Sequence, residues 1–127
     1  MYTGYDVGKM NAKNIHLDLN KKFELNEFYD VVVLLGVLEY LEDPVSTVRR
    51  LKRYCNEVII SYVAAKNLHS SNVKIREGIG VKNHLTKIAL TSCLRESDLT
   101  IINHFTIWDN PNDEHLMFHL RWHNHTE

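Results

Sequence analysis

The clearest pattern along the chain is an unbroken aliphatic run from Tyr29 to Gly36, in which apolar and polar positions do not alternate. Alternation disappears when both faces of a strand are covered, so this run predicts a strand buried on both faces of a sheet. A second run, Glu57 to Val63, has the same character. Strands of this kind are typical of α/β proteins.

The segment between these two runs carries the signals of a helix. Asp43 is a favoured N-cap residue, and Pro44 suits the first helical turn. Apolar residues then recur at helical spacing as far as Cys55. A strand, a helix and a second strand in this order predict a parallel βαβ unit, whose crossover is expected to be right-handed.

The segments on either side of this unit give weaker signals. Two short apolar stretches near the amino terminus, Tyr2–Asp6 and Asn14–Asp18, each end in an aspartate and are predicted as strands. The segment 64–83 is rich in polar residues and glycine and is predicted as a long loop. After it, Thr86 can cap a helix that is expected to run to about Ser97.

Strand patterns return at the end of the chain. Leu99–Trp108 is predicted to place Ile101, Phe105 and Ile107 on one face, and His115–Trp122 alternates between apolar and polar residues. The connection between them is short, so the two strands are expected to be antiparallel. Residues 1–127 are therefore predicted to form one α/β domain with a mostly parallel mixed sheet and an antiparallel strand at its carboxyl end.

Composition narrows the functional classes. The 127 residues include 15 Lys and Arg and 16 Asp and Glu, for a formal net charge of −1, so no nucleic-acid partner is predicted. The longest uncharged apolar run, Val31–Leu38, is far shorter than the roughly 20 residues that span a bilayer, so no membrane partner is predicted. The two cysteines suit a reducing, cytoplasmic compartment.

Several stretches together have a familiar order. Tyr29–Val33, continued by Gly36–Pro44, gives an aromatic residue, Asp and aliphatic residues, then Leu-Glu and a helix-starting Asp-Pro. Gly4–Asp6 and Asn14–Leu19 add two strand ends that carry an acid. These stretches resemble class I S-adenosylmethionine (SAM)-dependent methyltransferases, which have a Rossmann-like fold with a reversed final strand. The family's first strand and Gly-rich turn have no counterpart here, so an N-terminally truncated domain of this type is expected.

The resemblance implies cofactor-binding residues at the carboxyl ends of the predicted strands, where open α/β sheets bind their ligands. Asp6 would accept hydrogen bonds from the ribose hydroxyls of SAM, and Asp18 or Leu19 would contact its adenine. The remaining candidates are Gly36, Val37, Leu38 and Glu39.

Simpler explanations exist for most of these candidates. Asp6 and Asp18 are also ordinary turn residues. Gly36 lets the backbone approach a ligand or merely ends the strand. Glu39 faces the charged end of the cofactor or is favoured only because it precedes a helix.

The predicted function is methyl transfer to a small molecule or an unidentified acceptor, selected by residues after Ser61 and by the 64–83 loop. Such a transfer needs donor and acceptor held in line with water excluded, and it needs no nucleophile, so no catalytic residue is predicted. The alternative is a non-catalytic interaction module that forms a homodimer through an unpaired edge at Val31–Leu35 or Tyr2–Asp6.

A metal site is weighed because three histidines, His115, His119 and His123, are spaced four apart, as ligands on one face of a helix would be. The apolar residues around them alternate with period two, which favours a strand. No metal is therefore predicted.

Overall fold

The computed structural model describes residues 5–6, 15–16, 19–21, 23–25 and 27–123. Its elements are β1 (Tyr5–Asp6), β2 (Ile15–His16), β3 (Tyr29–Leu34), α1 (Pro44–Arg50), β4 (Cys55–Ala65), α2 (Ser70–Gly78), α3 (Lys87–Glu96), β5 (Leu99–Asp109) and β6 (Asp113–Trp122), with 3-10 helices at Leu38–Tyr40 and Leu51–Arg53. Strands β1 and β2 lie inside the two predicted amino-terminal stretches, whose other residues are outside the described ranges.

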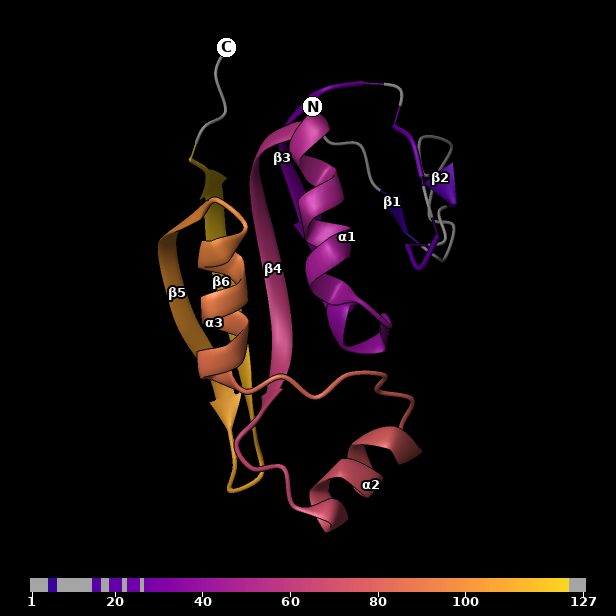
Figure 1. The fold of residues 1–127 in the computed structure, drawn as a ribbon, viewed down its shortest axis with the longest axis vertical. Helices are drawn as coiled ribbons and strands as arrows, with labels where there is room; N and C mark the ends of the chain where they lie inside the picture. Colours follow the sequence, from indigo (N-terminus) through magenta and orange to yellow (C-terminus); the bar gives the residue numbers. More distant parts are fainter. Residues whose placement is uncertain (1–4, 7–14, 17–18, 22, 26, 124–127) are drawn as a thin grey trace.

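The main sheet has four strands in the order β3-β4-β6-β5 (Figure 1). Strands β3 and β4 are parallel, with Val31 opposite Glu57 and Leu34 opposite Ile60. Strand β6 runs antiparallel to β4, and β5 runs antiparallel to β6. The predicted βαβ unit and the antiparallel carboxyl-terminal pair are thus confirmed. Strands β1 and β2 form a separate parallel pair.

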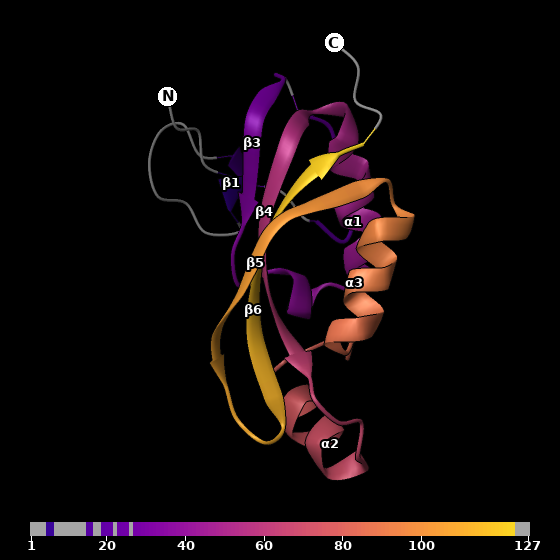
Figure 2. The same ribbon diagram turned by 90° about the vertical axis from the view of Figure 1, so that its left-hand side faces the viewer.

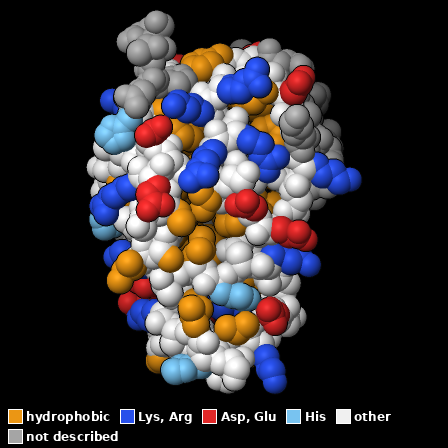
Figure 3. Space-filling view, viewed as in Figure 1, with side chains coloured by type: hydrophobic (Ala, Val, Ile, Leu, Met, Phe, Trp, Pro, Cys, Tyr) orange, Lys and Arg blue, Asp and Glu red, His pale blue; other side chains and the backbone are white. Residues whose placement is uncertain are grey.

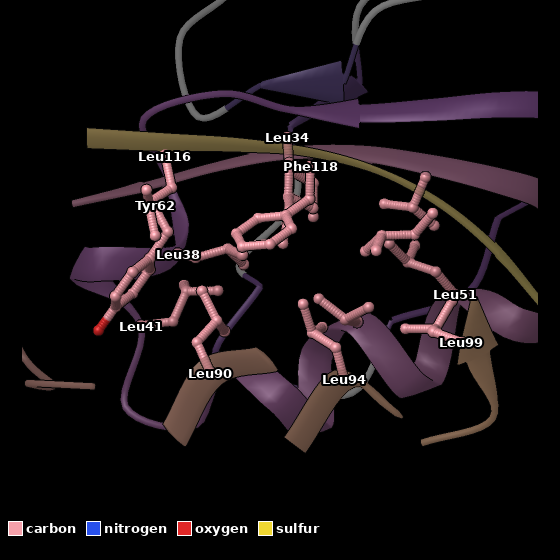
Figure 4. Close-up of a cluster of buried hydrophobic side chains, with 14 of the residues drawn as sticks. Leu34, Leu38, Leu41, Leu51, Tyr62, Leu90, Leu94, Leu99, Leu116 and Phe118 are labelled. Atoms are coloured by element: carbon pink, nitrogen blue, oxygen red, sulfur yellow. The ribbon is translucent and has the colours of Figure 1, made fainter. Parts of the chain in front are cut away.

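Helices α1 and α3 both cover the same side of this sheet (Figure 2). The hydrophobic core lies between them and the sheet, where side chains from the helices meet alternate residues of β4 and β6 (Figure 4). Its most deeply buried members include Leu38, Val58, Ile60, Tyr62, Leu90, Leu94, Leu116, Phe118 and Leu120. The period-two pattern predicted for the last strand therefore marks the core face of β6.

Helix α1 begins as its sequence predicts. The Asp43 carboxylate accepts a hydrogen bond from the Ser46 backbone N–H at 3.0 Å, and Pro44 occupies the first turn. Thr47 Oγ1 donates to the Leu19 carbonyl at 3.1 Å, which ties the helix to the segment before β3. The cap thus fixes where the crossover from β3 to β4 starts.

The basic side chains of this crossover make contacts within the molecule. Arg49 Nε donates to Ser97 Oγ at 2.7 Å, and the Lys52 ammonium lies 4.0 Å from the Asp98 carboxylate. Lys and Arg side chains on this face are interspersed with Asp and Glu (Figure 3). The helix therefore presents a mixed surface rather than a basic patch.

The opposite face of the sheet differs from expectation. The prediction that β3 is buried on both faces is wrong, because Val31 and Val33 are 39% and 43% exposed and Leu35 after the strand is 52% exposed. Among the described elements, no helix covers this side (Figure 2). The unbroken aliphatic run thus reflects a strand whose second face is apolar but is not covered by a helix of the described part of the chain.

Strand β5 also departs from its predicted pattern. Ile101 pairs with the core residue Leu120, whereas Phe105 pairs with Met117 on the opposite face. The ladder shifts register between Ile101 and Asn103 and again between Thr106 and Trp108. A bulge adds a residue to one strand and reverses the side on which later side chains point, so the expectation of one apolar face was wrong.

An ionic cluster crosses the uncovered face between β4 and β6. The Glu57 carboxylate accepts hydrogen bonds from the Arg121 guanidinium and pairs with His119 Nε2 at 2.6 Å. The hydrogen bonds from Arg121, and then from His119, lower the pKa of Glu57 below its usual value of 4.5.

Acid should therefore weaken the fold through Glu57. A carboxyl whose pKa is lower in the folded state adds stability above its unfolded pKa and loses it as the pH falls through the folded one. We expect the free energy of unfolding, measured by urea titration, to fall as the pH drops below 4.5. Glu57→Gln and Arg121→Gln should each flatten this part of the profile, and unchanged slopes in both variants would contradict the assignment.

The core can be tested with two phenylalanines on neighbouring strands. Phe118 is 1% exposed, so Phe118→Ala should leave a cavity and lower the free energy of unfolding by about 3–5 kcal/mol. Phe105 is 53% exposed, and Phe105→Ala should cost less than about 1 kcal/mol. Urea unfolding of both variants makes the comparison, and equal losses would place the core on the wrong face of the sheet.

Candidate functional site

The candidate site begins where β3 ends, at Gly36. The glycine has φ of +66°, a conformation that residues with a side chain rarely adopt, and no heavy atom of the described residues outside its chain neighbours lies within 4 Å of the position a Cβ would take. Its N–H donates to Ser61 Oγ on β4 at 2.8 Å. The turn is therefore fixed by β4 on one side and open on the other, which leaves its backbone accessible at the carboxyl end of a parallel strand pair.

The next residues turn back into the protein. Val37 precedes a single 3-10 turn, and its carbonyl accepts from the Tyr40 N–H at 3.0 Å. The Leu38 side chain is 1% exposed and belongs to the core. Of these two candidates, Leu38 can therefore offer a ligand only its backbone.

Glu39 is the most unusual member of the segment because its carboxylate is buried, with the residue only 3% exposed. Oε2 accepts a hydrogen bond from the Val63 N–H at 2.8 Å. Oε1 has no hydrogen-bond partner among the described residues. Strand β3 pairs with β4 only as far as Ile60. The Glu39 carboxylate therefore supplies the acceptor that β3 no longer provides for the backbone N–H of Val63.

Two side chains that were not predicted from the sequence, Asn83 and Tyr62, hold this turn through hydrogen bonds. Asn83 donates to the carbonyls of Leu38 at 2.9 Å and Leu41 at 2.7 Å. The Tyr62 hydroxyl donates to Asn83 Oδ1 and accepts from the Leu85 N–H at 2.9 Å. Burial raises the pKa of Tyr62, which keeps its hydroxyl a donor. Their spacing in the sequence carries no signal, since each acts across the fold.

Arg76 corrects the prediction that 64–83 is a loop. This segment contains helix α2, beyond the carboxyl end of β4 (Figure 1). Arg76 is only 2% exposed, and its guanidinium donates to Asp113 Oδ1 at 2.9 Å, the Val63 carbonyl at 3.0 Å and His84 Nδ1 at 2.9 Å. Because the helix is held by these distant partners and has no side-chain cap, local sequence signals did not reveal it.

Tyr40 forms the outer rim of the same region. Its side chain is 45% exposed, and its ring lies 3.7 Å from the position that a Cβ on Gly80 would take. Gly80 follows α2 with φ of +95°, and Ile79 beside it is 67% exposed. An exposed apolar rim thus flanks the carboxyl ends of β3 and β4.

The amino-terminal candidates are Asp6, Asp18 and Leu19. Asp6 ends strand β1, and its side chain lies outside the described part of the structure. Asp18 lies outside the described residues. Leu19 is half-buried against the core, and its carbonyl accepts from Thr47, so it faces α1.

The other titratable groups do not form a second centre in the described part of the chain. Burial raises the pKa of Cys55 to about 11, so its thiol is protonated near neutral pH. His115 and His119 lie on strand β6, as the alternating pattern favoured. No three His, Cys, Asp or Glu side chains among the described residues are grouped to hold a metal.

Comparison with known proteins gives structural matches only. No protein-family model and no curated protein matches the sequence. A putative sarcosine dimethylglycine methyltransferase from Galdieria sulphuraria matches with a TM-score of 0.69 and 10% identity, over 86% of this chain and 58% of that one. Magnesium protoporphyrin IX methyltransferase from Synechocystis PCC 6803, solved with SAH bound, matches with a TM-score of 0.58 and 20% identity, over 86% and 51%.

The chain has a class I SAM-dependent methyltransferase fold. It spans about half the length of the structures it matches. The cyclase SpnF also matches, with a TM-score of 0.65, 8% identity and coverage of 87% and 55%. One of the neighbours with this fold is thus described as a cyclase, so the fold alone does not fix the reaction. In the described part of the chain, no helix is long and apolar enough to cross a bilayer.

Glu39 provides a test of how this turn is held. Glu39→Ala removes the acceptor of the buried Val63 N–H and should lower the free energy of unfolding by roughly 1–3 kcal/mol. Glu39→Gln keeps a side-chain oxygen and should retain most of that stability. Hydrogen exchange of the Val63 amide, followed by NMR, should accelerate in the alanine variant alone, and equal rates in both variants would contradict the contact.

Proposed function

We propose that this domain binds SAM at the carboxyl ends of β1 and β3 and takes part in SAM-dependent methyl transfer. The observation that carries the proposal is the open turn at Gly36, at the end of a parallel strand, in a fold whose structural neighbours include methyltransferases solved with SAM or SAH. Ligands of open α/β sheets bind at this edge.

The residues present are compatible with such a cofactor. The space beside Gly36, into which no described side chain reaches within 4 Å of a Cβ position, would admit a ligand against the backbone of Gly36 and Val37. Asp6, by resemblance, would accept hydrogen bonds from the ribose hydroxyls, and Asp18 with Leu19 would border the adenine. Leu38 would offer the ligand only its backbone, and Glu39 would hold the turn in place, since both side chains point into the protein.

The chemistry asks little of the protein beyond placement. Bound SAM supplies a methyl group already activated by its sulfonium. The chain's residues hold the reactants in line and keep water away, which is the main source of acceleration in such a displacement. The buried contacts of Glu39 and Asn83 serve this role because they hold the turn in place, and Arg76 holds helix α2 to the end of β4 beside it.

We assign acceptor selection to the rim formed by Tyr40 and the end of α2. Both flank the proposed cofactor edge, and the exposed side chains of Tyr40 and Ile79 favour an acceptor with an apolar surface. The acceptor is proposed to be a small molecule. This keeps the sequence-based expectation that the 64–83 segment governs specificity, now as a helix and its flanking residues rather than a loop.

The alternative of a non-catalytic interaction module is not favoured by the structural neighbours. A homodimer through the edge of β3 stays a prediction, as does a cytoplasmic location, which rests on cysteine usage.

Isothermal titration calorimetry with SAM tests the proposal. We expect a dissociation constant of about micromolar order and complete loss of binding in Asp6→Ala, because the ribose hydroxyls lose their acceptor. Asp30→Ala is the matched control, since Asp30 is an exposed aspartate at the opposite, amino end of β3.

Circular dichroism should show both variants folded like the unaltered chain. Absence of heat at millimolar SAM from a folded chain would overturn cofactor binding by residues 1–127. Equal affinity in all three proteins would instead remove Asp6 from the site.

A further inference from the structure

Helix α2 is attached to the rest of the molecule by polar side chains. Its two buried residues, Asn72 and Arg76, are four positions apart and therefore lie on one face of the helix. Its apolar residue Ile75, by contrast, is 61% exposed. A surface helix ordinarily buries an apolar stripe against the core. Because α2 buries two hydrogen-bonding residues instead, its attachment depends on whether their hydrogen bonds can form.

Asn72 holds the amino-terminal half of the helix. Its side-chain Nδ2 donates to the backbone carbonyls of Asn67 at 3.1 Å and Asn112 at 3.2 Å. Neither an amide nor a carbonyl changes charge with pH. This half of the attachment is therefore insensitive to acid, and any sensitivity must come from the partners of Arg76.

The contact between Arg76 and His84 fixes the protonation state of the imidazole. A guanidinium has only donors and keeps its charge, so the Arg76 Nε–H that lies 2.9 Å from His84 Nδ1 requires an unprotonated nitrogen there. His84 Nε2 then carries the ring proton and faces Glu77 Oε2 at 3.4 Å. The contact therefore exists only with the neutral ring in this one tautomer.

A proton on His84 Nδ1 would break this contact. Both facing atoms would then be donors, and two positive charges would lie side by side. The side chains of Arg76 and His84 are only 2% and 18% exposed, so solvent screens the pair poorly. Histidine is the side chain whose charge ordinarily changes between about pH 5 and 8. The attachment of α2 is thus linked to a protonation step in this range.

The other charged groups around this pair do not replace the lost hydrogen bond. Glu77 on α2 is 60% exposed and faces Nε2 of the ring rather than Nδ1. Asp113 on β6 binds the guanidinium of Arg76 through Nη1. Tyr62 on β4 interacts with the same guanidinium and with the Glu39 carboxylate. As placed, none of these four groups gives Arg76 Nε the acceptor that a protonated imidazole withdraws.

We propose that His84 is a pH-sensitive latch for helix α2, in which the neutral ring holds the carboxyl-terminal half of the helix through Arg76 and the protonated ring releases it. The latch is closed at the higher pH and opens as the pH falls and Nδ1 takes up a proton. Ile79 caps this half of α2 and belongs to the rim beside Tyr40, so the rim loosens when the latch opens. The latch acts in the folded chain and requires no bound cofactor.

NMR at about pH 8 and about pH 5.5 tests the latch, because an ordinary imidazole titrates between these values. At the higher pH, the nitrogen chemical shifts of the His84 ring should show an unprotonated Nδ1. The Val81 amide, which donates to the Arg76 carbonyl at 3.1 Å, reports on the end of α2. Its hydrogen exchange, relative to an unstructured peptide at the same pH, should accelerate at least about tenfold at the lower pH. The Leu90 amide in α3 should not change in this way.

Three variants separate the latch from other effects of acid. His84→Asn keeps an acceptor near the position of Nδ1 and cannot titrate, so Val81 should stay protected at both pH values. His84→Ala has no acceptor, so Val81 should exchange fast at both. His69→Asn is the matched control at the amino end of the same helix, and it should keep the pH dependence of the unaltered chain.

The proposal is overturned by a protonated Nδ1 at about pH 8, or by Val81 exchange that does not change with pH in the unaltered chain. It is also overturned by pH dependence that persists in His84→Asn or is lost in His69→Asn, by full protection in His84→Ala, or by an equal acceleration at Leu90. All measurements are made without SAM, so failure of the latch is distinguishable from failure of cofactor binding.

Discussion

The parallel pairing of β3 with β4 is the constraint on which the rest of the structure depends. It places Leu34 beside Ile60 and ends there, so that the chain must turn at Gly36 while β4 continues with β6 as its one remaining neighbour among the described strands. Because β3 ends before β4 does, the turn at Gly36 is exposed at the edge of the sheet, where the candidate site lies. A longer β3 would have paired with β4 to its end and left no open turn.

The part of β4 beyond Ile60 shows how the fold compensates for the strand partner that β3 no longer supplies. Backbone groups that lose a strand partner must find another acceptor or donor when they are buried. At Val63 the N–H binds the Glu39 carboxylate and the carbonyl binds Arg76. The Glu39 and Arg76 side chains thus satisfy both backbone groups of Val63. Glu39 ties the turn after β3 to this residue, and Arg76 ties helix α2 to it. The hydrogen bonds that satisfy the backbone of β4 therefore also hold the turn at the proposed ligand-binding edge in place.

The difference between local patterns and contacts made across the fold explains which features were predictable from the sequence. Strand β3, the Asp43 cap and the alternation in β6 are local patterns, and they appear where they were expected. Helix α2 was missed because its stability comes from Arg76 reaching across the fold. The bulges in β5 leave no local signal. The turn at Gly36 was predicted as a site, but the inward direction of Glu39 depends on where β3 stops relative to β4, which no periodicity reports.

Ligand binding at Gly36 acts on the end of β3, so its free energy is expected to be coupled to that of the β3–β4 pairing. A ligand that binds only the formed turn favours the paired strands, and any change that loosens their pairing weakens the binding. The coupling runs through Ser61 and Asn83, because their hydrogen bonds hold the turn from the β4 side.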